Sequence, residues 1–165
     1  MIKENILRKN LLTNEIDCGS VDSIFEIQNL AGNIIAEHPY IEIKEGSEDY
    51  SNFYLSKTKN IKLAATKEEA KKRILTKYPE SKQINYLADT SYIQYKEAEA
   101  LAKGETYTKT EAEVKCQLEA YECKIYINNI RNKSNELEKI IELQEDYKAL
   151  EAIDISDDKY WLLSK

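Results

Sequence analysis

A continuous helical pattern runs from Thr66 to Ile141, and it constrains the fold of the 165-residue chain more than any other feature. In its last part, small and apolar residues recur at alternating steps of four and three positions. This is the spacing of the a/d face of a helix that packs along a neighbour. The face comprises Cys116, Ala120, Cys123, Ile127, Ile130, Ser134, Leu137 and Ile141. The pattern predicts a long helix with one buried face.

Local signals divide this stretch into three helices. The first is predicted to begin at Thr66, since a threonine followed three residues later by Glu69 is the signature of a capping box. It should end at about Lys77, because Tyr78 precedes Pro79 and a residue before proline is biased out of the helical region.

The second and third helices are expected to form an antiparallel hairpin. The second should begin at Pro79, because proline fits the first turn of a helix, and it should end at Gly104. Thr108 with Glu111 repeats the capping pattern and marks the start of the third helix. A short loop between two amphipathic helices makes a hairpin.

Each hairpin helix carries an apolar face that we expect to be buried. On the second helix this face comprises Ile84, Leu87, Ala88, Tyr95, Ala98 and Ala102. On the third helix the a/d face is widened at its start by Val114, Leu118, Tyr121 and Ile125. We expect the widened face to be buried in the first part of the third helix and only the narrow a/d face to be buried in the rest of it.

The residues before the hairpin have strand character. Tyr40–Lys44 alternates between apolar and polar residues, which indicates a half-buried strand. Residues 45–49 are expected to form a loop, and Asn52–Leu55 a further short strand. We therefore predict an α+β fold, mainly α, with a small N-terminal antiparallel β element followed by a long antiparallel helical hairpin.

Other N-terminal segments leave alternatives open. Residues 1–15 are expected to form a short helix or an arm. Ala31–Asn33 is a plausible turn between two short segments, but a helix over Val21–Gln28 fits the same residues. The expected domains are an N-terminal mixed element at 1–63, the hairpin at 64–142 and an acidic C-terminal tail at 143–165.

Composition argues against several classes of protein. The net charge is −6, and no cluster of Lys and Arg suggests a nucleic-acid groove. No run approaches the roughly 18 apolar residues of a membrane helix, and the N-terminus lacks the pattern of a secretory signal. Three cysteines do not form a disulfide framework. Cys116 and Cys123 are expected to be buried, and the bacterial host cytoplasm is the expected compartment.

The residues that usually carry catalysis are scarce. His38 is the only histidine, so no Cys–His or Ser–His pair is convincing. The four glycines are isolated and form no phosphate loop, and Asp154, Asp157 and Asp158 do not have the spacing of a calcium loop. We therefore expect no enzyme, no catalytic residues, no metal and no cofactor.

The tyrosine content is the feature that points towards a binding function, since the chain contains twelve tyrosines. Tyr95 and Tyr121 fit the hairpin core, whereas Tyr86, Tyr92 and Tyr126 fall nearer its flanks. Exposed tyrosines are favoured at protein interfaces, so these three are candidate partner-binding residues. The alternative is that tyrosine simply replaces phenylalanine in a chain from an AT-rich genome.

The C-terminus combines an acidic segment with the apolar run Tyr160–Leu163. This run either docks on the core, which we favour, or is held for a partner. The second alternative makes Asp157, Asp158, Tyr160 and Trp161 candidate partner-binding residues.

Three segments carry a resemblance to a known group of proteins. Residues 64–74, Tyr78–Asn85 and Ile127–Leu137 resemble a helical region of phage and prophage tail or tail-fibre proteins. The resemblance covers roughly residues 64–142, about half of the chain. The sequence departs from such proteins because it has no fibre repeats, no Gly-rich shaft and no receptor-binding β-structure.

The resemblance implies a protein that works by binding another protein. The first implied function is that of an anti-CRISPR inhibitor, which binds a host RNA-guided nuclease such as that of a type VI system. The alternative is a tail-fibre component or tail assembly chaperone, which could form a homo-oligomer through the long helix. Neither implies a direct nucleic-acid or membrane partner.

Overall fold

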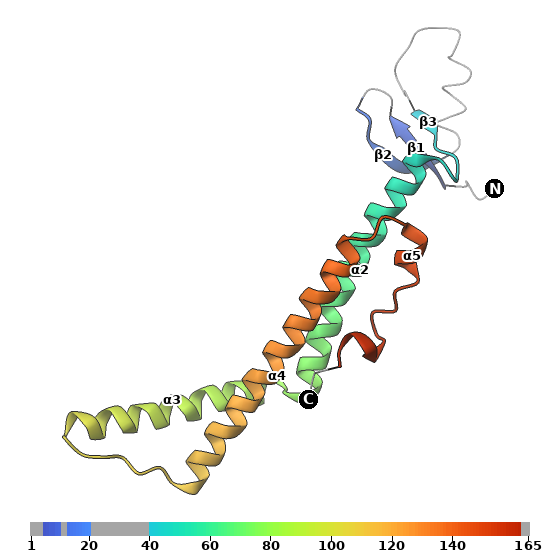
Figure 1. Ribbon diagram of the computed structural model, residues 1–165. Helices are drawn as coiled ribbons and strands as arrows, with labels where there is room; N and C mark the ends of the chain where they lie inside the picture. Colours follow the sequence, from blue (N-terminus) through green and yellow to red (C-terminus); the bar gives the residue numbers. More distant parts are fainter. Residues whose placement is uncertain (1–4, 11–12, 21–39, 163–165) are drawn as a thin grey trace, which may run out of the picture. The chain divides into compact units, whose positions relative to one another are not determined.

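The computed structural model describes residues 5–10, 13–20 and 40–162 (Figure 1). Its elements are β1 (Asn5–Asn10), β2 (Ile16–Ser20), β3 (Tyr40–Glu42), α2 (Glu48–Lys77), α3 (Glu80–Ala102), α4 (Glu111–Glu142), α5 (Tyr147–Glu151) and the 3-10 turn η1 (Asp158–Tyr160). The predicted fold class, α+β and mainly α, is confirmed. The segments predicted around residues 21–37, and His38, lie outside the described residues.

The chain divides into two compact units. The first contains Met1–Asn60 and Gln144–Ile153, and the second contains Ile61–Leu143 and Asp154–Lys165. Helix α2 continues from the first unit into the second. The residues expected as one acidic tail are therefore divided between the two units.

The first unit contains a three-stranded antiparallel sheet with β1 at its centre. Residues 5–10 are thus a strand, not the expected short helix or arm, because β1 pairs both with the neighbouring β2 and with β3, which is distant in sequence. Arg8 forms an ion pair with Asp17 across β1 and β2 at 2.6 Å, which lowers the pKa of that carboxyl. A side chain at Gly19 would collide with the Arg8 guanidinium. A larger residue at this position would have to displace the Arg8 side chain from its place above Gly19.

Helix α2 begins well before the predicted position. The expected loop is confirmed for residues 45–47, but its last two residues and the expected strand at 52–55 are helical, since α2 begins at Glu48. The aromatic residues here lie on a helix, where the rings of Tyr50 and Tyr54 are 4.5 Å apart and Tyr147 of α5 lies 6.1 Å from Tyr54. One contact within a helical turn and one with a distant helix thus favour the helix over the strand that the residue types suggested.

Thr66 lies inside α2 and does not cap it. Its side chain is fully buried, and its hydroxyl donates to the carbonyl oxygen of Lys62 at 2.8 Å. A threonine that bonds back to the preceding turn can sit in a helix interior. The first predicted helix start is therefore wrong.

The break between α2 and α3 is confirmed. Helix α2 ends at Lys77, and α3 follows Pro79. Tyr78 is buried, and its carbonyl oxygen accepts a hydrogen bond of 2.7 Å from the side-chain amide of Gln83. Gly104 follows α3 with a φ of +72°, the left-handed conformation that ends many helices.

The predicted face of α4 is the core of the second unit. Five of its members are buried, and the other three are half-buried. The buried ones are Cys123, Ile130, Ser134, Leu137 and Ile141. The later half of α4 lies beside α2, where the Tyr126 hydroxyl donates to the carbonyl oxygen of Arg73 at 3.5 Å and Lys67 lies 3.9 Å from Glu138.

Docking of the C-terminal segment in the second unit is confirmed for Trp161. This side chain is 3% exposed, and its Nε1–H donates to the carbonyl oxygen of Ile155 at 2.8 Å. The Arg73 guanidinium lies 5.1 Å from the Trp161 ring centre, donates to the Ser156 carbonyl at 3.0 Å and pairs with Asp158 at 2.8 Å. Arg73 therefore fastens residues 155–161 to α2.

Replacing Ile141 with alanine should lower the free energy of unfolding by about 2–5 kcal/mol, because the lost side chain leaves a cavity that its neighbours fill only in part. The control is Ile140→Ala in the same turn, where 44% of the residue is exposed and the change should stay under about 1 kcal/mol. Urea denaturation followed by circular dichroism measures both. Equal effects would contradict the core assignment.

Replacing Arg73 with alanine should release the C-terminal segment, because it removes one hydrogen bond, one ion pair and one cation–π contact. Trp161 is the only tryptophan, so its fluorescence emission reports the change directly and should shift to the red. Lys71→Ala on the exposed side of α2 is the control and should leave the emission unchanged. An unshifted spectrum in the Arg73 variant would contradict this attachment.

Candidate protein-binding surface

The structure separates the three candidate tyrosines. Tyr92 is 58% exposed. Tyr86 is half-buried and donates its hydroxyl hydrogen to Glu119 at 3.0 Å, and the half-buried Tyr126 contacts the ring of Tyr78. Among these three, Tyr92 offers a partner the largest exposed surface.

The four C-terminal candidates are engaged in local structure. Asp157 caps η1 by accepting from the backbone N–H of Lys159 at 2.9 Å, which helps to lower the pKa of the Asp157 carboxyl. Asp158 pairs with Arg73, and Trp161 is buried. Tyr160 is half-buried. These residues hold the segment in place, so the candidate surface is better sought on the hairpin.

The hairpin loop is organised around Glu113. Helix α4 is capped by Thr110, and Glu113 accepts a hydrogen bond of 2.8 Å from the Thr110 backbone N–H, which completes a capping box. The Glu113 carboxylate also accepts from the Tyr107 hydroxyl at 2.7 Å and pairs with Lys96 at 3.0 Å. These donors lower the pKa of Glu113 to about 2. The capping box predicted at Thr108 therefore lies two residues further on.

Polar pairs join α3 to α4 and to the loop between them. Tyr86 bonds to Glu119, Lys96 pairs with Glu113, and Glu97 pairs with Lys109 at 2.8 Å. Ile93 is the one buried residue of α3. Polar pairs therefore set the contact between the two helices.

The apolar face predicted for α3 is exposed, which corrects the expectation that it is buried. Ile84 is 65% exposed and Tyr95 is 60% exposed. The remaining members of this face are also exposed, namely Leu87, Ala88, Ala98 and Ala102. The polar pairs turn the opposite side of α3 towards α4, so this apolar face points away from it.

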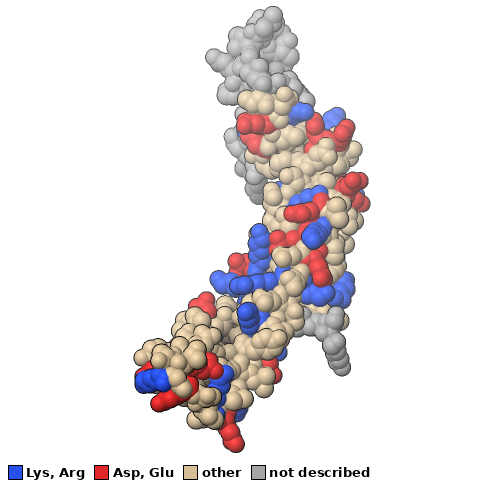
Figure 2. All heavy atoms as spheres, turned by 60° about the vertical axis from the view of Figure 1, so that its left-hand side comes forward, with Lys and Arg blue, Asp and Glu red and all other residues tan. Residues whose placement is uncertain are grey.

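The second apolar stripe of α4 is also exposed. Val114, Leu118, Tyr121 and Ile125 were expected to widen the buried face, but they lie on the other side of the helix with 41–61% of each exposed. Helical spacing could have shown this, because these residues fall about half a turn from the buried face. In Figure 2, uncharged atoms cover much of the hairpin surface at the lower left.

A groove of about 670 Å³ runs between α3 and α4. Its apolar lining includes Ala120, Tyr121 and Ile127. Lys124 and Arg131 also line it, and neither has a hydrogen-bond or ion-pair partner among the described residues. No acidic residue lines the groove, although the chain carries a net charge of −6. Sequence periodicity did not identify this groove, because two separate helices form it.

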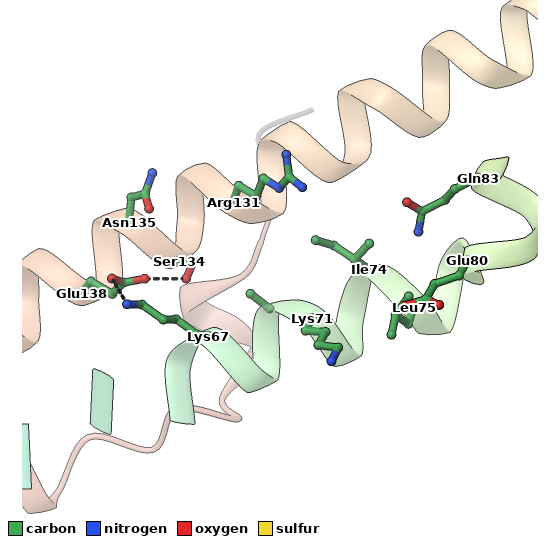
Figure 3. Close-up of a pocket in the computed structure, with 11 residues that line it drawn as sticks. Lys67, Lys71, Ile74, Leu75, Glu80, Gln83, Arg131, Ser134, Asn135 and Glu138 are labelled. Atoms are coloured by element: carbon green, nitrogen blue, oxygen red, sulfur yellow. Dashed lines mark hydrogen bonds and ion pairs between the residues drawn. The ribbon is translucent and has the colours of Figure 1, made fainter. Parts of the chain in front are cut away.

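A second groove of about 580 Å³ lies where α2, α3 and α4 meet (Figure 3). Its charges are mixed, and Glu138 accepts from the Ser134 hydroxyl at 2.9 Å and pairs with Lys67 (Figure 3). Arg131 lines both grooves. Some of the acidic groups of this groove are already paired, so its lining favours one kind of ligand less clearly than the lining of the first groove does.

The described residues contain no cluster of three or more His, Cys, Asp or Glu side chains that could hold a metal ion. Burial raises the pKa of the Cys123 thiol, which disfavours the thiolate nucleophile. Within the same part of the chain, no helix combines the length and apolar character needed to cross a membrane.

Comparison with known proteins leaves the family open. No family model matches the chain, and neither a curated protein nor a solved structure matches it significantly.

Replacing Glu113 with glutamine should lower the melting temperature at neutral pH, because glutamine imitates the protonated acid. The folded-state pKa of about 2 lies below the ordinary value of 4.5. The stabilisation is therefore complete above pH 4.5 and is lost as the pH falls towards 2. The difference in melting temperature between wild type and variant should stay constant from pH 7 to 5 and should decrease below pH 5. The control Glu111→Gln in the same turn should melt at nearly the wild-type temperature at every pH. A difference between wild type and Glu113→Gln that persists at pH 2 would contradict this assignment.

Proposed function

We propose that the chain is a non-enzymatic protein-binding protein and that the groove between α3 and α4 receives a segment of its partner. The observation that carries the proposal is the combination of an apolar lining with two cations, Lys124 and Arg131, that have no ion-pair partner among the described residues. Tyr121, which is 61% exposed at the edge of the groove, adds a large rigid contact surface.

The lining defines the chemistry of the partner segment. Apolar side chains on one face of the segment would cover Ala120 and Ile127. A carboxylate at its edge would meet Lys124 or Arg131, since opposite charges across an interface favour both orientation and rate of association. An amphipathic segment with at least one Asp or Glu fits both requirements.

The resemblance to phage tail regions suggests the class of partner. We propose a host RNA-guided nuclease, such as that of a type VI system, which the chain would inhibit as an anti-CRISPR protein in the host cytoplasm. The alternative partner is a tail protein, in which case the chain would be a tail-fibre component or tail assembly chaperone. Both alternatives use the same surface.

The test is affinity capture with the tagged chain in its native host during phage infection, with mass spectrometry to identify bound proteins. Recovery of an RNA-guided nuclease, and inhibition of RNA cleavage by that purified nuclease, would support the inhibitor function. Recovery of tail proteins without a nuclease would overturn the inhibitor function and support the alternative. Recovery of neither would overturn both.

The binding surface is tested by reversing one charge. Lys124→Glu should weaken capture at least about tenfold, because it places an acid where the partner acid binds. Lys139→Glu is the matched control, since Lys139 is an exposed lysine of α4 that lines neither groove. Equal capture by both variants would contradict the assignment of the groove.

A further inference from the structure

Helix α3 presents an uncharged seam to solvent. We define the α3 seam as the residues that follow one another at steps of four, three, four, three and four along one side of the helix. They are Ile84, Ala88, Ser91, Tyr95, Ala98 and Ala102. All of them are exposed. This spacing is that of a helix that packs along another helix over about 27 Å.

The seam reverses the usual arrangement of a surface helix, whose polar side faces water. Lys96 of α3 instead pairs with Glu113 of α4, and Glu97 pairs with Lys109 of the loop that precedes α4. In the described part of the chain, α4 is the helix that packs along α3. No helix of the described residues therefore covers the seam, whose side chains are exposed. A contiguous apolar face of this kind usually marks an interaction site.

The order of side chains along the seam makes it complementary to itself. A two-fold axis that crosses the seam midway between Ser91 and Tyr95 pairs two copies of α3 antiparallel. It places Ile84 opposite Ala102 and Tyr95 opposite Ser91. Each large side chain thus meets a small one of the other copy.

Between these two pairs, small side chains face each other. Ala88 lies opposite Ala98, so two small side chains meet and let the helices approach closely. A self-complementary patch of this kind is what a two-fold interface between identical chains requires. We propose that the α3 seam is the interface of an antiparallel homodimer.

The flanks of the seam extend this interface. The same two-fold axis brings Leu87 near Leu101 of the second copy, and these residues are 68% and 77% exposed. Specific interfaces bury at least about 1,200 Å² in total, so a dimer needs these flanks as well as the seam. We expect a reversible dimer, because a single short helix from each copy forms the interface.

The first test is the mass of the full chain in solution. Sedimentation equilibrium from 1 to 100 µM should show a monomer–dimer equilibrium. Tyr95→Lys should weaken the dimer at least about tenfold, because it places a charge in the centre of the interface. Tyr121→Lys is the matched control, since Tyr121 is 61% and Tyr95 60% exposed on different helices. The control should dimerise like wild type.

The second test determines the register. Ala88→Lys and Ala98→Glu should each weaken the dimer, whereas the double variant should recover it, because each lysine then faces a glutamate of the other copy. A parallel dimer would place like charges together and show no recovery. Circular dichroism should show the same helix content in all variants, since both positions are exposed.

Several results would overturn the proposal. These are a wild-type chain that stays monomeric at 100 µM, a dimer that survives Tyr95→Lys, a stable trimer, and a double variant without recovery. A monomeric chain whose partner capture depends on Tyr95 would assign the seam to another protein and would also overturn it. The groove is tested separately by Lys124→Glu, which lies on α4 outside the seam and should alter partner capture while leaving the mass unchanged.

Discussion

The buried face of α4 is the interaction on which the second unit depends. Each fully buried large apolar side chain, such as Ile130 or Leu137, stabilises the fold by about 1.5–3 kcal/mol relative to exposure. The early half of α4 carries the polar contacts to α3, and its later half lies beside α2. Arg73 then attaches the C-terminal segment to α2. One helix thus positions every other part of the unit.

Polar pairs determine how α3 is rotated about its own axis in the hairpin. The pairs of Lys96 with Glu113 and of Glu97 with Lys109 fix the inner side of α3. Contacts between apolar side chains alone would allow α3 to rotate about its axis. Hydrogen-bonded ion pairs at about 3 Å require a defined direction, so they fix that rotation. The apolar residues are consequently left outside, where they are available to other chains. The same contacts hold the loop through Glu113, whose carboxylate meets several donors at once.

Two kinds of surface result, and their chemistry differs. The α3 seam is uncharged and matches a copy of itself, which suits pairing of identical chains. The groove between α3 and α4 combines an apolar lining with the cations Lys124 and Arg131, which pair with no group in the described part of the chain. This combination suits an acidic amphipathic segment of a different protein. A dimer would present two such grooves, so a partner with two binding segments would gain avidity.

The sequence alone determined the features that depend on neighbouring residues: the end of α2 before Pro79, the left-handed Gly104, and the spacing of the α4 face. It misjudged the start of α2, because Tyr50 and Tyr54 favour strands locally but form ring contacts on a helix. Only the tertiary structure decided which way α3 faces. Periodicity shows that a helix has an apolar side, but the charge pairs with another helix determine whether that side is buried.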